Sequence, residues 1–190
     1  MQRDRQFALE RHKAQLDPLT QLLNRTALVR DMNKLMAAAA SNNKPLSVMV
    51  LDIDHFKRIN DEHGHVVGDQ GSRQVAQTLQ QQSRGKDIVS RYGGEEFVLV
   101  LPETDPDEAQ IAAQRFCRGI RNTPLILESG EKINVTVSVG IYSTVPAPQS
   151  NWEPLVAAAD AAMYNAKRSG RDRVAVAATS FKPTPAHGTI

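Results

Sequence analysis

Four carboxylates occur in two short segments that the sequence places at strand ends. Asp52 and Asp54 lie at the carboxyl end of the apolar run LSVMVLDID, which is typical of a buried strand. Side chains alternate along a strand, so both groups point to one face if the strand persists. Glu95 and Glu96 follow two glycines between strand-like runs. If these two places adjoin, three or four carboxylates share one small volume.

Such a cluster is unfavourable unless a cation neutralises it. Oxygen ligands without thiolates favour a hard ion, Mg²⁺ or Mn²⁺, over zinc. Two hard ions held by strand-end carboxylates are the apparatus of nucleotidyl transfer, in which one activates an attacking hydroxyl and the other stabilises the leaving group. Lys57, Lys167 and Arg171 are candidate phosphate ligands. The latter two fall at a predicted helix C-terminus, where cations are favoured.

Composition narrows the class of protein. The chain has 190 residues and a hydrophobic fraction of 41%, which predict one globular domain and exclude a disordered chain. A formal charge of +2 does not indicate a nucleic-acid partner. No apolar run reaches the roughly 18 residues of a membrane span. The single cysteine, Cys117, excludes an internal disulfide. We expect a cytoplasmic domain that does not itself contact a membrane. An alternative is that it is the cytosolic part of a larger, membrane-bound protein.

Three histidines near the carboxylates, His55, His63 and His65, raise the alternative of a zinc site. No cysteine and no HExxH pattern accompanies them, so surface or packing roles are favoured.

The segments that must position the carboxylates alternate between helix and strand patterns. A Gly-Gly pair between two strand-like runs predicts a tight hairpin, because glycine accepts the positive φ of such turns. The resulting order is the split βαββαβ pattern followed by a helix and a strand, an α+β fold with an antiparallel or mixed sheet and helices on one face. The predicted helices cover 26–41, 68–83, 106–121 and 153–168, and the strands 46–54, 87–92, 97–101, 133–143 and 173–176.

The two ends of the chain differ from this core. Residues 1–16 favour helix but carry only a thin apolar stripe, and three interpretations stay open: the end of a helix from an upstream module, a dimer seam, or a frayed leader. Residues 17–176 form the predicted catalytic domain. Residues 177–190 contain two prolines and no periodicity, and we expect a flexible tail.

Five segments of the chain form a set of motifs: DPLTQLLNR, LDIDHFKRINDEHGHVVGD, RYGGEEF, VSVGI and ADAAMYNAKRSGRDR. Together they resemble the blocks of the GGDEF diguanylate cyclase family, in family order and at family spacing. The resemblance covers about 17–176 and implies a fold like the palm of polymerases and nucleotidyl cyclases. Glu95 stands where many members carry Asp, a substitution common among active members.

The resemblance implies a reaction in which two GTP molecules condense into cyclic di-GMP and release two pyrophosphates. Each 3′-hydroxyl attacks the α-phosphate of the other nucleotide. Each domain holds one GTP, so activity requires a face-to-face homodimer, with an upstream sensory module as a further expected partner. Two alternatives are an inactive GGDEF module that binds GTP or cyclic di-GMP as a signalling receptor, and a mononucleotide cyclase that makes cyclic GMP.

Catalytic roles carry over from the family by motif position. Asp52 and Glu95 would ligate the Mg²⁺ or Mn²⁺ ions, two per half-site, together with the backbone carbonyl of Ile53. Glu96 would be a further ligand or a general base, and both roles stay open.

Substrate contacts carry over in the same way. A carboxylate that accepts from guanine N1–H and N2–H₂ would penalise ATP, because adenine lacks this donor pair. An unmet buried polar group costs ~1–3 kcal/mol. The candidates are Asn60 and Asp69 for guanine, Phe56 and Lys57 for covering the phosphates, Lys167 and Arg171 for the terminal phosphates, and Gly93 and Gly94 for close approach of the turn.

A second motif, Arg84-Gly85-Lys86-Asp87, ends five residues short of Gly93. Active family members often carry an RxxD product-inhibition site at this offset. Arginine can grip guanine O6 and N7 in a bidentate manner. Arg84 and Asp87 would hold cyclic di-GMP together with an arginine of the following helix, for which Arg115 is the candidate and Arg118 the alternative.

Overall fold

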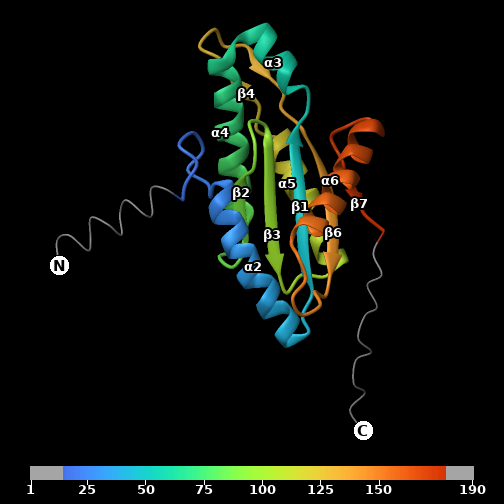
Figure 1. The fold of residues 1–190 in the computed structure, drawn as a ribbon. Helices are drawn as coiled ribbons and strands as arrows, with labels where there is room; N and C mark the ends of the chain where they lie inside the picture. The colour runs from blue at the N-terminus through green and yellow to red at the C-terminus, as the bar shows by residue number, and fades with distance from the viewer. Residues whose placement is uncertain (1–14, 179–190) are drawn as a thin grey trace, which may run out of the picture.

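The structure is a computed structural model that describes residues 15–178 (Figure 1). The predicted leader and tail therefore lie almost wholly outside the described residues. The helices are α2 (Arg25–Asn42), α3 (Phe56–His63), α4 (His65–Gln82), α5 (Pro106–Arg121) and α6 (Glu153–Arg168). The strands are β1 (Leu46–Ile53), β2 (Ile88–Arg91), β3 (Glu96–Pro102), β4 (Leu125–Ile126), β5 (Lys132–Ile133), β6 (Val137–Thr144) and β7 (Val174–Val176). None of the helices in this part of the chain is both long and apolar enough to cross a membrane.

A five-stranded sheet in the order β2-β3-β1-β6-β7 forms the centre of the fold. All its neighbours are antiparallel except β6 and β7, which are parallel. Every residue of the central strand β1 is buried. The predicted α+β class with a mixed sheet and the split βαββαβ order are confirmed.

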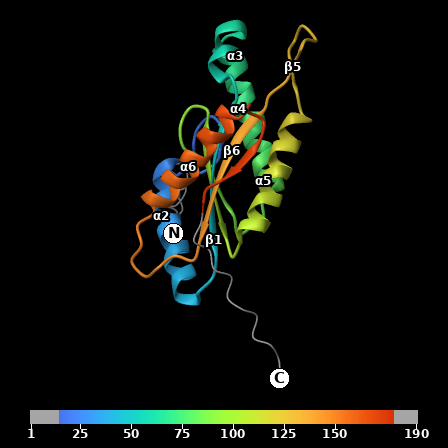
Figure 2. The same cartoon turned by 90° about the vertical axis from the view of Figure 1, so that its right-hand side faces the viewer.

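Helices cover both faces of this sheet, so the expectation of helices on one face was wrong (Figure 2). Alternate residues of β1 enter two separate cores: Met49 and Leu51 pack with α4 and α5, whereas Val48 and Val50 pack with α2 and α6. A strand that is apolar at every position must be covered on both sides. The continuous run LSVMVLDI therefore carried the correct signal.

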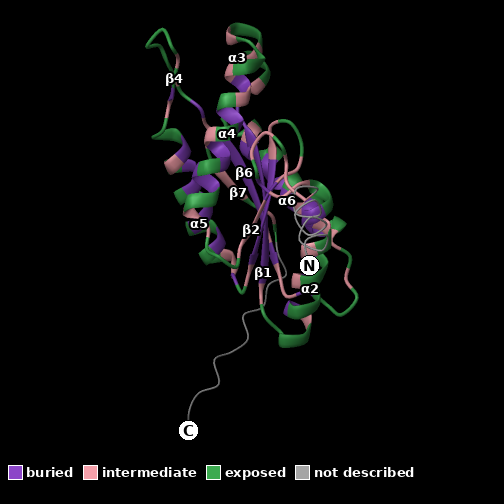
Figure 3. Cartoon of the chain, turned by 90° about the vertical axis from the view of Figure 1, so that its left-hand side faces the viewer, coloured by how far each residue is buried: buried purple, intermediate pink, exposed green. Residues whose placement is uncertain are grey.

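Three local features also differ from the sequence prediction. Helix α3 was missed because Ile59 is its only buried residue, which leaves little apolar periodicity. The predicted strand 133–143 is two strands, β5 and β6, and β5 pairs with β4 in a projecting hairpin whose tip is exposed (Figure 3). The β2–β3 hairpin is confirmed, but neither Gly93 nor Gly94 has a positive φ.

Helix α6 packs closely across β6 because that strand has a glycine at the point of contact. A Cβ atom on Gly140 would overlap the carbonyl oxygen of Ala159 and the backbone nitrogen of Met163. Both obstacles are helix backbone, which no side-chain rotation can move. The helix that carries Lys167 is thus seated on the sheet at a fixed depth.

We expect Gly140→Ala to lower the free energy of unfolding by roughly 3 kcal/mol, because the helix must move away from the sheet. The matched control is Gly85→Ala, since a Cβ at Gly85 meets nothing within 4 Å. The control should stay within about 0.5 kcal/mol of the parent. Urea unfolding of the three proteins measures both values, and equal losses in the two variants would contradict this packing argument.

Candidate active site

The carboxyl end of β1 and the signature turn lie side by side, as the sequence predicted. Asp52 is directly opposite Glu96 in the antiparallel pairing of β1 with β3. The next residue, Ile53, donates its N–H to the carbonyl oxygen of Glu95 at 3.1 Å. Asp52, Ile53, Glu95 and Glu96 are therefore brought together at one edge of the fold.

A lysine from α6 reaches into this group. The Nζ atom of Lys167 lies 2.6 Å from Oδ1 of Asp52, and both side chains are largely buried. Burial raises the pKa of the Asp52 carboxyl above its ordinary value, although the Lys167 ammonium opposes this effect. The negative charges of Glu95 and Asp54 raise the pKa further.

Glu96 shares the same surroundings. Burial raises its pKa, and the negative charges of Asp160 and Asp52 add to the shift. Asp160 lies on α6 and sequence reasoning gave it no role. Its position seven residues before Lys167, about two helical turns, places both on one face of the helix and was the available signal.

Asp54 differs from the other three carboxylates because protein donors occupy both of its oxygen atoms. Its Oδ1 accepts from Ser138 Oγ at 2.7 Å, and its Oδ2 accepts from Thr136 Oγ1 at 2.7 Å and from the Asp172 N–H at 3.0 Å. Asp54 is only 4% exposed. Of the four carboxylates in the predicted cluster, Asp52, Glu95 and Glu96 therefore remain as candidate ligands of a cation.

The remaining donor set fits a hard divalent cation in its chemistry. Asp52, Glu95 and Glu96 supply oxygen atoms only. Burial raises the pKa of Asp52 and of Glu96, and the negative charges of neighbouring carboxylates add to both shifts. Within residues 15–178, no group of three or more His, Cys, Asp and Glu side chains is already arranged to hold a metal ion. Lys167 is the positive partner of Asp52 in this arrangement.

The candidate phosphate ligands surround the same strand end. Phe56 and Lys57 form the start of α3, which is separated from the end of β1 by two residues. Lys57 is exposed. The first backbone N–H groups of a helix are suited to anions. Arg171 follows α6 in a short loop with φ of 62° and is exposed. The start of α3 and the loop after α6 thus bring positive groups to one end of the sheet.

The candidate guanine residues lie on the adjoining helices α3 and α4. Oδ1 of Asn60 is buried and has no hydrogen-bond partner among the described residues. It lies against Gly68, where a Cβ atom would overlap it. Asp69 is the next residue of α4 and is half-buried. Gly68 therefore leaves room for the Asn60 side chain beside Asp69.

The signature turn is anchored by an arginine that sequence reasoning did not assign. Arg91 donates from Nε and Nη2 to the carbonyl oxygen of Gly94, at 3.2 and 2.8 Å. Its Nη1 lies 3.1 and 3.2 Å from the two carboxylate oxygens of Asp17. No local pattern connects residues 74 positions apart. A Cβ on Gly94 would meet nothing within 4 Å, so the outer side of the turn is open.

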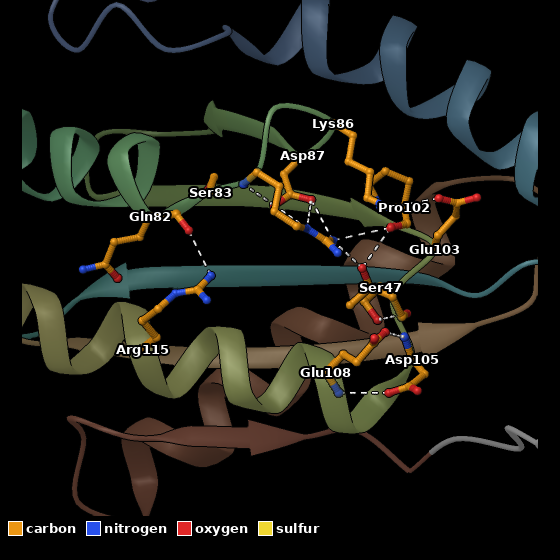
Figure 4. Close-up of polar contacts among 12 residues, drawn as sticks. Ser47, Gln82, Ser83, Lys86, Asp87, Pro102, Glu103, Asp105, Glu108 and Arg115 are labelled. Atoms are coloured by element: carbon orange, nitrogen blue, oxygen red, sulfur yellow. Dashed lines mark hydrogen bonds and ion pairs between the residues drawn. The ribbon is translucent and has the colours of Figure 1, made fainter.

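The RxxD pair is formed at the other end of the β2–β3 hairpin (Figure 4). Arg84 donates to the Asp87 carboxylate at 2.8 Å and to Thr104 Oγ1 at 2.5 Å. Arg115 donates to the carbonyl oxygen of Gln82 at 2.9 Å, next to this pair but without a described contact to it. Arg118, the alternative, lies one helical turn further along α5. An open groove of about 550 Å³ is lined in part by Arg84 and Asp87.

Comparison with known proteins shows the family to which the chain belongs. The family model described as "Diguanylate cyclase, GGDEF domain" matches residues 14–173. Diguanylate cyclase DosC of Escherichia coli K12 is 40% identical over 166 residues, which are 87% of this chain and 36% of that protein. Diguanylate cyclase DgcP of Pseudomonas aeruginosa is 40% identical over 168 residues, 88% of this chain and 25% of that protein. The chain thus spans about a third or less of these relatives' length.

Solved structures extend the likeness to the fold. The GGDEF domain of DgcB from Caulobacter crescentus, in complex with c-di-GMP, superposes with a TM-score of 0.82 at 33% identity, over 87% of this chain and 94% of that one. Diguanylate cyclase SiaD of Pseudomonas aeruginosa, in complex with its activator SiaC, gives 0.84 at 33% identity, over 93% of this chain and 66% of that one. The chain therefore belongs to the GGDEF family of diguanylate cyclase domains.

Proposed function

We propose that residues 17–176 are the catalytic domain of a diguanylate cyclase that condenses two GTP molecules into cyclic di-GMP and releases two pyrophosphates. The observation that carries this proposal is the opposition of Asp52 and Glu96 across β1 and β3, with Glu95 adjacent and Lys167 paired to Asp52. Family membership supplies the reaction, and this cluster retains the groups that it requires.

Asp52, Glu95 and the Ile53 carbonyl are the proposed ligands of Mg²⁺ or Mn²⁺, two ions per half-site. When bound, such ions lower the pKa of the attacking 3′-hydroxyl and stabilise the charge on the leaving pyrophosphate. Glu96 has a raised pKa, which brings it closer to the operating pH of a general base. This shift favours the base role over that of a further ligand.

The positive groups take the phosphates. Lys57 and the backbone N–H groups from Phe56 onward cover the α- and β-phosphates at the start of α3. Lys167 and Arg171 hold the terminal phosphates, which become the leaving group. Lys167 is paired with Asp52 in the ligand-free domain. When the ligands bind, the ion takes the place of Lys167 at Asp52, and the terminal phosphates take the place of Asp52 at Lys167. Gly93 and Gly94 allow the turn to approach the nucleotide.

Guanine selection is assigned to Asn60 and Asp69. The unpartnered Oδ1 of Asn60 supports a ligand-binding role, because buried polar atoms are otherwise paired. Asp69 would accept from the N1–H and N2–H₂ groups that adenine lacks.

One domain completes only half of the reaction, so the active species is a homodimer in which two GTP-loaded sites face each other. An upstream sensory module would control this pairing, in a cytoplasmic setting and without nucleic-acid or membrane contact by this segment. The greater length of the relatives and the activator bound to SiaD support regulation by further domains or partners.

Cyclic di-GMP is also the proposed inhibitor, bound by Arg84, Asp87 and Arg115. Structures of related GGDEF domains with c-di-GMP support this assignment. Arg84 is held by Asp87 and Thr104, so its guanidinium must leave Thr104 to grip a guanine. Product binding therefore competes with a contact already present in the domain.

The reaction is tested by incubating GTP and Mg²⁺ with the protein and separating products by chromatography. We expect cyclic di-GMP from the parent and a loss of at least ~10²-fold in rate for Glu95→Gln, because a proposed ion ligand is lost. Glu103→Gln, a surface change beyond the other end of β3, is the matched control and should retain activity.

Two results would contradict the proposal. Cyclic GMP as the product would identify a mononucleotide cyclase. Absence of product from a concentrated, nucleotide-stripped sample that light scattering shows to be dimeric would identify a binding module.

Glu96→Gln should stabilise the ion-free fold. The raised pKa of Glu96 means that the folded state binds more protons than the unfolded chain between the ordinary and the raised value. The ionised carboxylate thus costs stability above the raised pKa, and this cost vanishes below the ordinary value. Thermal melts at pH 8 should show a gain on the order of 2–4 °C, which disappears on acidification and shrinks when Mg²⁺ is added to both proteins.

Glu103→Gln serves as the control for these melts. Lys86 lowers the pKa of Glu103 through a hydrogen bond, so this substitution should give no gain. A Glu96→Gln protein that is less stable than the parent at pH 8 without Mg²⁺ would contradict the expected cost of burying the ionised Glu96 carboxylate beside Asp160 and Asp52.

Arg84→Ala should relieve product inhibition without loss of the initial rate. We expect the concentration of cyclic di-GMP that halves activity to rise at least about tenfold, since one good bidentate guanine contact is worth roughly 1–3 kcal/mol. Initial rates with added cyclic di-GMP measure it, and Lys86→Ala, within the same motif, is the control. Unchanged inhibition in Arg84→Ala would overturn the assignment of this site.

A further inference from the structure

We propose that Asp54 is a positioning residue, which holds the loop of residues 169–173 so that Arg171 meets the terminal phosphates of the nucleotide. This inference rests on the proposed function, because it takes the phosphate role of Arg171 from there. Asp54, directly after β1, thereby has a role different from that of Asp52: it positions the loop and leaves ion binding to its neighbours.

Asp54 connects three segments at once. Ser138 belongs to β6 and Thr136 directly precedes that strand, and both hydroxyls donate to the Asp54 carboxylate. The backbone of Asp54 also donates to the carbonyl oxygen of Thr136 at 2.9 Å. The third donor, the Asp172 N–H at 3.0 Å, comes from the loop after α6. The end of β1 and the start of β6 thus form a fixed base on which the loop is tied.

The loop requires the hydrogen bond to Asp54 because its backbone is in an unfavourable conformation. Arg171 and Asp172 have φ values of 62° and 48°, which residues with a Cβ atom rarely adopt. Gly170, with φ of 117°, precedes them. Strained residues of this kind persist when the surrounding structure holds them in place. The hydrogen bond from the Asp172 N–H to Asp54 fixes the peptide that directly follows Arg171.

A second hold comes from α5. Arg121 donates from Nε and Nη2 to the two carboxylate oxygens of Asp172, at 2.7 and 2.9 Å. The backbone of Asp172 is therefore held by Asp54 and its side chain by Arg121. Arg171 lies between Asp172 and the end of α6 and is exposed. Within residues 15–178, its guanidinium makes no hydrogen bond or ion pair. The loop is fixed while its cationic side chain stays available to a ligand.

The charge of Asp54 has a cost that a purely structural residue would avoid. It raises the pKa of Asp52, two residues away at the ion-binding strand end. Three donors converge on Asp54, and only a carboxylate presents acceptors on both of its atoms. An asparagine would accept on one atom and turn an N–H₂ group toward a donor on the other. The carboxylate is thus required by the three donors in spite of its effect on Asp52.

The test compares binding of 3′-deoxy-GTP, which lacks the attacking hydroxyl, with binding of GMP, which lacks the terminal phosphates. Calorimetry in MgCl₂ gives the ratio of the GMP dissociation constant to the 3′-deoxy-GTP dissociation constant for the parent, Asp54→Asn, Arg171→Ala and the double variant. We expect each single variant to reduce this ratio by about tenfold, the scale of one charge-assisted hydrogen bond. The double variant should match Arg171→Ala, because Asp54 acts through Arg171.

Two further variants separate positioning from folding. Ser47→Ala removes a buried hydroxyl on the same strand that bonds Thr104 and Ser143, far from the loop, and should lower the melting temperature without changing the ratio. Arg121→Ala removes the ion pair with Asp172. Because the Arg121 side chain is half-exposed, this variant should fold, and the ratio should be reduced. This variant tests the loop even if Asp54→Asn fails to fold.

The outcomes distinguish this inference from the function on which it rests. A reduced ratio in Arg171→Ala together with the parental ratio in Asp54→Asn, or in Arg121→Ala where Asp54→Asn does not fold, would overturn the positioning role alone. The parental ratio in Arg171→Ala would overturn the phosphate role of Arg171 and the inference with it. A further loss in the double variant would show that Asp54 acts by another route and would also overturn it.

Discussion

The register between β1 and β3 is the constraint on which the rest of the site depends. It sets Asp52 opposite Glu96, and it is fixed by strands whose residues are buried on both faces. A slip of one residue would turn every side chain of a strand to the other face. The apolar pairs along β1 and β3 would then enter the wrong core, and Asp52 would turn away from Lys167 on α6. Packing of the two cores thus stabilises a group of carboxylates that repel one another.

The irregular segments of the site are held by contacts between residues far apart in the chain. Arg91 joins the signature turn to Asp17 at the start of the domain, so a displacement of that first segment acts directly on the turn. Asp54 and Arg121 join the loop after α6 to the sheet and to α5. The strands are rigid, and these polar contacts fix the segments that are proposed to meet the nucleotide.

Sequence reasoning succeeded where the signal was local. The run that ends at Asp52 and Asp54, the Gly-Gly hairpin and the helix that starts at Pro106 all depend on neighbouring residues. That helix begins with a capping box between Asp105 and Glu108, which is readable from adjacent positions. The family motifs then identified the candidate site residues.

The failures have the opposite character. The contacts of Asp54 are to residues more than 80 positions away, and no local pattern reveals them. Asp160 acts on Glu96, which is distant in the sequence, and its spacing from Lys167 on α6 was the only local signal for it. Helix α3 has too few apolar residues to be recognised by periodicity. The cover on both faces was missed although apolar residues occupy both faces of β1, because the split βαββαβ pattern was taken to imply one layer of helices.

In the proposed site, Asp52 and Glu95 bind the catalytic ion, whereas Asp54 does not. Anomalous diffraction from crystals grown with Mn²⁺ and 3′-deoxy-GTP tests this claim directly. We predict manganese bound by the carboxylates of Asp52 and Glu95, with Lys167 moved from Asp52 toward the phosphates and Asp54 still bonded to Ser138. Manganese coordinated by Asp54, or nucleotide bound with no manganese at Asp52, would contradict the account.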